Sequence, residues 1–305
     1  MPDGPRSRPG PRHGPADTVI SAAGPIGSLI ELRKKDGKDE PWRLGGKAEP
    51  GTGSSPLVML NRVAFFDPGK GKLHDGGKQE LVRWACNHQL GQDAGLIRAV
   101  TARREAALRA LSTRRHVIRL HAEPEWRLAV GLDSTANAHE ISLALHGTYG
   151  WPVLPGSALK GLAAAWAVAS GTVKADDIGR VLGTPRLDVA TERDTARGTV
   201  CFLDGIPAGQ AVTVEPDVFT PHVKPYYDGV ATGKLVPPAE YHNPVPLLFL
   251  TVRGVFSVNL HGDNRKDTEK AAEWLKAAGD DLGAGAKTAA GYGYLSVRPA
   301  EQVPA

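Results

Sequence analysis

One stretch decides the fold: residues 139–171 read HEISLALHGTYGWPVLPGSALKGLAAAWAVASG. Apolar residues stand at every second position of 141–145, which is the period of a β-strand. Turn-forming glycines and prolines follow at 147–155. Residues 157–170 then predict a helix, with Ser157 as its N-cap and Gly171 just beyond its end. This succession predicts a mixed α and β domain.

Patterns on both sides extend this stretch to a complete domain. The sequence predicts a strand already at 126–130, and later strands at 199–204, 247–260 and 292–297, the second of these three long or bent, with a helix at 268–278 capped by Asp267. The order β, α, β, β, α, β is that of the ferredoxin-like fold, in the α+β class. Residues 205–246 are rich in proline and too long for a hairpin loop, so they are predicted to be a functional insertion.

The chain that precedes this domain has a different composition. Residues 1–17 carry five prolines among glycines and arginines and are predicted to be disordered, and 1–60 as a whole is expected to be disordered or to dock on something else. Helical spacing at 78–90 and 96–111 predicts a helical hairpin. We therefore divide the chain into 1–60, a helical extension at 61–115, and a ferredoxin-like domain at 116–300.

The charge of the chain is mildly basic and unevenly distributed. The chain has 37 Lys and Arg against 33 Asp and Glu, a net charge of +4. Residues 98–127 alone hold eight Arg and three Glu, a larger local excess than that of the whole chain. Such a cluster is typical of a phosphate-binding surface, and equally of a solvated helix face.

Other features of the composition exclude several classes of protein. Cys86 and Cys201 stand far apart, so they form neither a disulfide framework nor a CxxC motif and are read as ordinary buried thiols. No apolar run is long enough to cross a bilayer, and the N-terminal residues lack the apolar core of a signal peptide. We expect a cytoplasmic protein that does not bind a membrane.

The predicted helix start at Gly156, Ser157 and Lys160 has an unusual charge. A lysine in the first turn lies next to the positive end of the helix dipole, which is unfavourable by several tenths of a kcal/mol. The arrangement becomes favourable if a phosphate binds the free N–H groups, the Ser157 hydroxyl and the Lys160 ammonium. A solvated lysine with a serine cap is the plainer interpretation, and both remain open.

A glycine-rich segment lies near the C-terminus, at 282–294. Gly283, Gly285, Gly291 and Gly293 surround the pair Lys287-Thr288. The segment is neither a P-loop nor a dinucleotide-binding motif, because the required glycines are missing. Glycines at these positions allow a ligand or strand to approach the backbone. A tight turn from helix to strand explains one or two of the glycines, but not the Lys-Thr pair among four of them.

Residues 220–227, TPHVKPYY, lie inside the predicted insertion. They alternate proline with side chains able to stack on bases or to contact phosphates, as in proteins that bind single-stranded nucleic acids. A loop stiffened by proline that packs its own tyrosines is the alternative.

Partial motifs of two kinds of catalytic site occur in the sequence. His139-Glu140 begins a zinc-protease motif, but Leu143 replaces the second histidine, so no metal or cofactor is predicted. A serine hydrolase would use Ser157 and Lys160 with Tyr241-x-Asn243 and Lys287-Thr288, in the order of penicillin-recognising enzymes. Ala289 replaces the last glycine of that pattern, and the histidines are expected to be structural.

Taken together, five segments resemble a known family. They are HEISLALHGTYGWPVLPGSALKG (139–161), GTVCFLDGIP (198–207), TPHVKPYYDG (220–229), YHNPVPLLFLTV (241–252) and LGAGAKTAAGYGYL (282–295). Their order and spacing over roughly 126–298 resemble the RAMP subunits of type III-B CRISPR (Cmr) effector complexes, in particular the subunit near the 3′ end of the guide RNA. The resemblance implies a RAMP core that binds CRISPR RNA, and target RNA as well, without nuclease activity of its own. It also implies contacts with other RAMP subunits and with the small helical subunit.

The resemblance also gives the candidate residues their roles. The family's helix-start motif falls on Gly156, Ser157 and Lys160, and its glycine-rich loop on 283–293; the insertion at 205–246 corresponds to a thumb-like hairpin. The predicted RNA-binding residues are Gly156, Ser157, Lys160, Arg180, Lys224, Tyr226, Gly285, Lys287, Thr288, Gly291, Tyr292 and Gly293. The cations among them would bind phosphates, and Tyr226 and Tyr292 would stack on bases. The alternative on the same fold is a guide-processing endoribonuclease with His146 or His222 as general base.

Overall fold

A computed structural model describes residues 55–67, 72–73, 76–132, 137–184, 196–233, 236–240 and 243–300. It also describes five two-residue strands nearer the N-terminus: β1 (Ser21–Ala22), β2 (Ile30–Glu31), β3 (Lys34–Lys35), β4 (Lys38–Asp39) and β5 (Arg43–Leu44). The predicted disorder of 1–17 falls outside the described residues.

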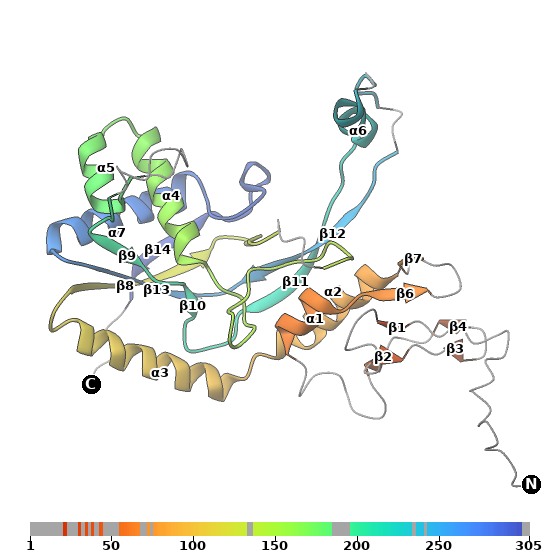
Figure 1. Ribbon diagram of the computed structural model, residues 1–305, viewed down its shortest axis with the longest axis horizontal. Helices are drawn as coiled ribbons and strands as arrows, with labels where there is room; N and C mark the ends of the chain where they lie inside the picture. The colour runs from red at the N-terminus through yellow and green to blue at the C-terminus, as the bar shows by residue number, and fades with distance from the viewer. Residues whose placement is uncertain are drawn as a thin grey trace, which may run out of the picture.

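A five-stranded antiparallel sheet forms the centre of the main domain (Figure 1). Its strands are β8 (His116–Pro124), β9 (Val200–Phe202), β10 (Ile206–Pro207), β13 (Phe256–Gly262) and β14 (Leu295–Pro299). The order across the sheet is β10-β13-β8-β14, and β9 also pairs with β13. Since α4 (Gly156–Ala169) follows β8 and α7 (Arg265–Asp281) follows β13, the chain has the predicted ferredoxin-like succession.

Helices cover the two faces of this sheet unequally. The helices α4, α7 and α5 (Ala175–Leu182) lie on one face, where Val258 and Leu260 of β13 are fully buried. The long helix α3 (Ala94–Leu111) runs along the other side (Figure 1). That side is polar, and Arg119 of β8 forms an ion pair with Glu105 of α3, N–O distance 2.9 Å.

The first strand lies earlier in the chain than the sequence pattern predicts. β8 ends at Pro124, and 126–130 continues it as an extended segment that is not a strand of the sheet and forms an isolated bridge, Leu128 to Val252. Residues 141–145 are likewise extended but belong to no strand, and Leu145 makes one bridge to Pro152. Alternation alone therefore identified an extended, half-buried backbone and not the strand that pairs in the sheet.

Two further predictions need correction in detail, and the predicted bend of the strand at 247–260 is confirmed. Ser157 is not the N-cap of α4, because the helix begins one residue earlier and Pro155 precedes it. Asp267 does not cap α7 either: Asn264 is the N-cap, and its side chain accepts a hydrogen bond from the Asp267 N–H. The long strand at 247–260 is bent into β12 and β13 at Gly254, which has a φ of +126°.

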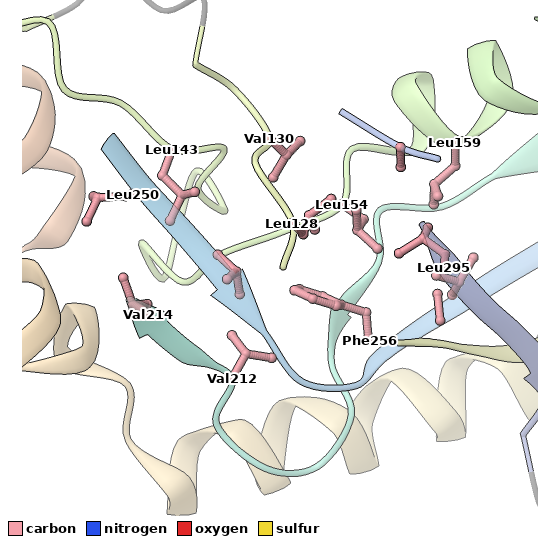
Figure 2. Close-up of a cluster of buried hydrophobic side chains, with 14 of the residues drawn as sticks. Leu128, Val130, Leu143, Leu154, Leu159, Val212, Val214, Leu250, Phe256 and Leu295 are labelled. Carbon is pink, nitrogen blue, oxygen red and sulfur yellow. The ribbon is translucent and has the colours of Figure 1, made fainter. Parts of the chain in front are cut away.

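Most of the predicted insertion at 205–246, together with the strand that follows it, forms an arm that projects from the main domain (Figure 1); its first residues, Ile206–Pro207, instead form β10 of the central sheet. The arm consists of β11 (Thr213–Phe219), α6 (Lys224–Thr232) at its far end, and β12 (Leu247–Arg253), which pairs with β11 along its length. A two-stranded ribbon is marginally stable by itself in water. Figure 2 shows why this one is held: Val214 and Leu250 at its base join the core that contains Leu154, Leu159 and Phe256.

Two glutamine side chains hold the free edge of the arm at the start of β11. Gln89 accepts a hydrogen bond from the Val214 N–H (2.7 Å) and donates one to the Val214 carbonyl (3.0 Å), and Gln92 makes the same two bonds with Val212. Each glutamine side chain thus makes the two hydrogen bonds that a residue of a neighbouring strand would make with its backbone. Gln89 lies in η2 (Gln89–Gly91), which follows α2 (Gly77–Asn87). The backbone from Gln89 to Gly91 is left-handed and directs α3 away from α2. The two helices therefore do not lie side by side, as the predicted hairpin would require (Figure 1).

A buried polar cluster attaches α1 (Pro56–Arg62) and the neighbouring strands β6 (Phe65–Asp67) and β7 (Lys72–Leu73) to the main domain. The Asn137 amide donates to the carbonyls of Leu60 and Val63 (2.7 and 2.9 Å) and accepts from the His139 N–H. His139 Nε2 in turn accepts from the Phe65 N–H at 2.8 Å, which requires a neutral imidazole. His139 therefore has a structural role, holding β6 against the main domain, and not a metal-binding one.

We expect Asn137→Ala to lower the free energy of unfolding by about 3 kcal/mol, because it leaves three buried backbone groups without their partner. Chemical denaturation followed by tryptophan fluorescence measures this change. The matched control is Asn87→Ala at the exposed end of α2, which should stay within about 0.5 kcal/mol of wild type. Equal effects of the two substitutions would show that the Asn137 bonds do not stabilise the docking of α1.

Candidate nucleic-acid interface

The glycines of the C-terminal loop mostly let the loop pack against its own protein. All four have positive φ, from +73° at Gly283 to +90° at Gly291. A Cβ atom on Gly293 would lie 1.9 Å from the Ala284 carbonyl oxygen, and one on Gly285 would lie 2.3 Å from that of Ala129. Only Gly291 has no heavy atom within 4 Å of such a Cβ. It is thus the one glycine of this loop with open space where a side chain would lie.

Backbone hydrogen bonds hold this loop against the segment that follows β8. The Gly293 N–H donates to the Arg127 carbonyl at 2.8 Å, and the Ala286 N–H donates to the Ala129 carbonyl at 2.7 Å. The Ala284 N–H closes the loop on the Gly293 carbonyl, also at 2.7 Å. The loop therefore presents Lys287 and Thr288 from a fixed backbone.

A continuous row of rings connects the loop with the arm; we call Trp126, Tyr292, Phe249, Phe219 and Lys287 the aromatic row. Lys287 Nζ lies 3.7 Å from the ring centroid of Phe219 and 5.2 Å from that of Phe249. The Phe249 ring meets Tyr292 edge-on at 5.6 Å, and Tyr292 contacts Trp126 at 4.8 Å. These contacts bring together the two strands of the arm, the loop and the start of the extended segment.

The exposed ring at this end of the row is that of Trp126, not that of Tyr292. Tyr292 is only 6% exposed, and its hydroxyl donates to Asp217 at 2.8 Å. Burial, together with the Asp217 carboxylate, raises the pKa of Tyr292 to about 12, so the phenol stays protonated. Trp126 rests on it and is 48% exposed. The prediction that Tyr292 stacks on bases is corrected accordingly.

Trp126 is not among the RNA-binding residues predicted from the sequence, because its alternation with Leu128 and Val130 predicts only a strand. The available signal was Pro124, since a proline cannot donate to the sheet ladder and so favours the end of a strand shortly before Trp126. Arg127 lies 5.3 Å from the Trp126 ring and forms ion pairs with Glu215 and Asp217 of β11. Its guanidinium therefore positions the arm and the indole together.

Lys287 is a cation without a carboxylate partner among the described residues. Burial lowers its pKa below the usual 10.5. Its backbone is left-handed, with a φ of +63°, and so projects the side chain toward Phe219. A phosphate at this position would supply the missing counter-charge, and the open surface at Gly291 gives it access.

The far end of the arm carries the other aromatic candidates. Tyr226 and Tyr227 of α6 meet edge-on at 5.4 Å, and Tyr227 is 62% exposed. Lys224 forms an ion pair with Asp228 one turn later, 2.5 Å between Nζ and Oδ2. The tyrosines are thus available for stacking, whereas the Lys224 charge already has a partner.

The start of α4 is partly occupied by the protein itself. The Gly156 N–H donates to the Asp204 carboxylate at 2.7 Å, so one of the predicted anion-binding donors has an internal anion. A Cβ on Gly156 would lie 2.3 Å from the Phe202 carbonyl oxygen. Glycine is therefore required here because the helix start packs closely against β9. Ser157 is exposed and Lys160 half-buried in the same turn. No hydrogen bond joins these two side chains in the described part of the chain.

Arg180 lies in a network that joins α5 to α7. Its guanidinium bonds to Asp177 and to the buried Asp267, and Lys270 donates to Asp177 at 2.7 Å. Thr199 also donates to Asp267. Arg180 thus has a structural role in this network, and its phosphate contact stays a prediction.

This network makes stability depend on acid pH. Hydrogen bonds from Lys270 and Arg180 lower the pKa of Asp177 to about 2. Burial alone would raise the pKa of Asp267, but bonds from Asn264, Arg180 and Thr199 lower it below 3.8. Both carboxylates contribute stability above the unfolded pKa of about 3.8 and lose it as the pH falls through their lower folded values.

We therefore expect the free energy of unfolding to fall between about pH 4 and pH 2, and Arg180→Ala to flatten that dependence. Urea denaturation at several pH values measures the slope. Arg98→Ala, on the exposed side of α3, serves as the control and should keep the wild-type slope. A slope unchanged by Arg180→Ala would contradict this assignment.

No helix among the described residues is long and apolar enough to cross a membrane. The same part of the chain has no group of three metal-ligating side chains. Cys86 and Cys201 are free thiols, and burial raises the pKa of Cys86 to about 11.

Comparison with known proteins identifies a family for most of the chain. The family model of the RAMP superfamily matches residues 41–296. The chain is 29% identical to the CRISPR system Cmr subunit Cmr6 of Pyrococcus furiosus, over 59% of this chain and 68% of that protein.

Two solved structures are also similar. A chain of the type III-B Cmr-beta complex bound to cognate target RNA matches with a TM-score of 0.55 and 16% identity, over 72% of this chain and 71% of that chain, which shows the shared fold. The crystal structure of Cmr6 from P. furiosus matches at 28% identity over 59% of this chain and 97% of that one, with a TM-score of 0.34.

Proposed function

This chain belongs to the RAMP superfamily, and on that basis we propose that it is a non-catalytic subunit of a type III-B CRISPR effector complex in the cytoplasm. In this role it binds the guide RNA near its 3′ end and contacts neighbouring protein subunits. The identity to a Cmr6 subunit supports the complex, and the aromatic row supports the RNA contact.

The observation that carries the RNA contact is the position of Lys287. Its ammonium has rings on one side, no carboxylate partner in the described residues, and the open glycine of its loop nearby. Half-exposed Trp126 offers a stacking surface at the other end of the same row. A cation beside an exposed ring is the combination that binds single-stranded nucleic acid, the cation on phosphate and the ring on a base.

Other candidate residues extend this surface in two directions. Lys224 and Tyr226 at the end of the arm would contact guide and target strands, as a thumb does. Gly156, Ser157 and Lys160 form a second backbone contact at the start of α4, and Gly285, Thr288 and Gly293 shape the loop. Phosphate contacts of this kind position an RNA without reading its sequence. The division into 1–60, 61–115 and 116–300 remains part of the proposal.

The experiment that tests the function is purification of the tagged protein from its native host at moderate salt, followed by RNA sequencing and protein identification. We expect short RNAs that share a repeat-derived 5′ sequence, together with other RAMP subunits and a small helical subunit. Recovery of the protein alone, without RNA, would overturn the proposal.

A guide-processing ribonuclease is the second candidate, and the structure weakens one of its residues. His146 Nδ1 accepts hydrogen bonds from the N–H groups of Thr148 and Tyr149, so this nitrogen is occupied by a turn. Cleavage of repeat RNA without metal by the wild type, and not by His146→Ala or His222→Ala, would favour the enzyme. Covalent labelling of Ser157 by a fluorophosphonate would instead reveal the serine hydrolase.

A further inference from the structure

The structure divides the eight arginines of residues 98–127 into two groups of four. One group is bonded within the protein, to the Asp204 carbonyl or in ion pairs with carboxylates: Arg104, Arg115, Arg119 and Arg127. The other group is exposed and forms no ion pair among the residues that the structure describes: Arg98, Arg103, Arg109 and Arg114. The local excess of positive charge therefore lies on the exposed side of α3 and just beyond its end.

The exposed side of α3 has small side chains between its arginines. Helical spacing places four exposed alanines opposite Ile97 and Leu108, the two buried residues of the helix. The alanines are Ala99, Ala102, Ala106 and Ala110. Arg98 and Arg109 lie on one side of this line of alanines, about 16 Å apart along the helix axis, and Arg103 lies on the other side. The helix therefore presents a narrow floor of small side chains with a guanidinium on either side.

No carboxylate of α3 offsets these charges. Glu105 is the one acidic residue of Ala94–Leu111, which the structure describes in full, and it pairs with Arg119 on the sheet at 2.9 Å. Arg103 has an uncharged partner, the Tyr149 hydroxyl at 2.8 Å. A solvated helix face usually carries long polar side chains and both signs of charge. Of the two interpretations that the sequence leaves open for this cluster, the phosphate-binding surface therefore fits better.

More positive charge gathers beyond the end of α3. Strand pairing places His261 of β13 directly opposite Cys201 of β9. Arg197 donates to the Cys201 sulfur at 3.5 Å, and a thiol is a weak acceptor. Burial, together with the nearby guanidiniums of Arg115 and Arg197, lowers the pKa of His261. We call the exposed arginines of α3 and its surroundings the basic face: Arg98, Arg103, Arg109, Arg114 and Arg197.

We propose that the basic face binds the phosphate backbone of the guide RNA, at a site other than the aromatic row. A guanidinium presents its N–H donors in a fixed fork that matches a phosphate. The alanine floor lets a strand lie close to α3, within reach of arginines on both sides. An acidic protein segment fits less well, because protein interfaces depend on large buried anchors and Leu96 is the one exposed large apolar residue of Ala94–Leu111, all of which the structure describes.

This inference rests on the proposed function, in which the same chain binds the guide at the aromatic row. A strand held at one site meets the other site at a high effective concentration, so contacts that are weak alone add to the affinity. The guide is therefore the RNA that the basic face meets first.

The salt dependence of RNA binding tests the proposal. Arg98→Gln with Arg103→Gln and Arg109→Gln removes three charges and keeps side chains that favour a helix. For a guide-like single-stranded RNA, we expect this triple variant to reduce the slope of log affinity against log salt by about two units. The reduction should add to that of Lys287→Ala, because no described contact joins Lys287 to the basic face. Fluorescence anisotropy of labelled RNA measures both.

The matched control removes three exposed cations from α7 instead. It consists of Arg265→Gln, Lys266→Gln and Lys276→Gln, and it should keep the wild-type slope. An equal reduction in the two triple variants would show a general effect of net charge and would overturn the inference.

Cross-linking in the purified complex identifies the RNA. Photoreactive thiouridines in the guide should cross-link to residues 94–115 of the wild type and not of the α3 triple variant. Absence of these cross-links from the wild type, or their formation only when target RNA is added, overturns the inference. Unchanged RNA binding by the triple variant, with loss of a protein subunit from its complex, would assign the basic face to a protein and overturn it as well.

The failure of this inference can be told apart from the failure of the proposed function. If the wild-type protein is recovered without RNA or other subunits, the proposed function fails. If the complex forms and Lys287→Ala reduces the salt slope while the α3 triple variant does not, only the inference about the basic face fails.

Discussion

Gly293→Ala is expected to lower the free energy of unfolding by about 4 kcal/mol or more. Its backbone has a φ of +80°, a conformation that costs a residue with a Cβ roughly 1–2 kcal/mol. The added Cβ would also lie 1.9 Å from the Ala284 carbonyl oxygen, which is backbone and has no flexible end to move. The loop would have to open and lose its bonds from Gly293 to Arg127 and from Ala284 to Gly293, at about 1 kcal/mol each or more.

The neighbouring glycine provides the matched control. Gly291 has the same left-handed backbone, with a φ of +90°, but open space where its Cβ would lie. Gly291→Ala should therefore cost only the conformational strain, about 1–2 kcal/mol. Urea denaturation of the two variants beside wild type measures the difference. If both lose the same stability, close approach is not what requires glycine at 293.

The order of the main elements could be predicted from the sequence because their patterns are local. The helical spacing of 157–170 and 268–278 agrees with α4 and α7 to within a few residues, and the glycine after the first helix does end it. The glycine-rich loop was also recognisable as a feature that a simple turn does not require. Local spacing is sufficient wherever a helix or strand buries one face.

Features that depend on distant partners could not be predicted in this way. Gln89 and Gln92 bond to Val214 and Val212, more than a hundred positions away, and nothing in their neighbourhood distinguishes them from surface glutamines. The exchange of roles between Tyr292 and Trp126 has the same origin. Tyr292 is buried, and its hydroxyl donates a hydrogen bond to Asp217 on the distant arm. A pattern of alternation does not show which of the two rings, Tyr292 or Trp126, is covered by the other.

The arm illustrates how these distant contacts serve the proposed RNA surface. Its base is fixed by the core, by the glutamine pair and by the ion pairs of Arg127, and Phe219 at the outer end of β11 touches Lys287 of the loop. Two segments that are far apart in the chain therefore form one rigid surface. Rigid placement reduces the ordering cost of binding, so a small set of contacts is sufficient for affinity.

Trp126→Ala is expected to weaken the binding of a guide-like single-stranded RNA by about 10- to 100-fold, because stacking of a base on an aromatic ring contributes roughly 1–3 kcal/mol. Lys287→Ala should weaken binding to all sequences alike and reduce the slope of log affinity against log salt by about one unit. Fluorescence anisotropy of labelled RNA, titrated with the purified protein at several salt concentrations, measures both effects.

Conservative variants separate stacking and charge from loss of structure. Trp126→Phe keeps a ring on Tyr292 and should restore most of the affinity, and Lys287→Arg should restore the salt slope. Trp126 is half-exposed, so its loss should cost little stability, and the unfolding midpoint of each variant checks this. If Trp126→Ala binds RNA as tightly as wild type while Lys224→Ala or Tyr226→Ala does not, the contact lies at the end of the arm and the aromatic row only supports it. If the salt slope of Lys287→Ala equals that of wild type, the ammonium does not contact a phosphate.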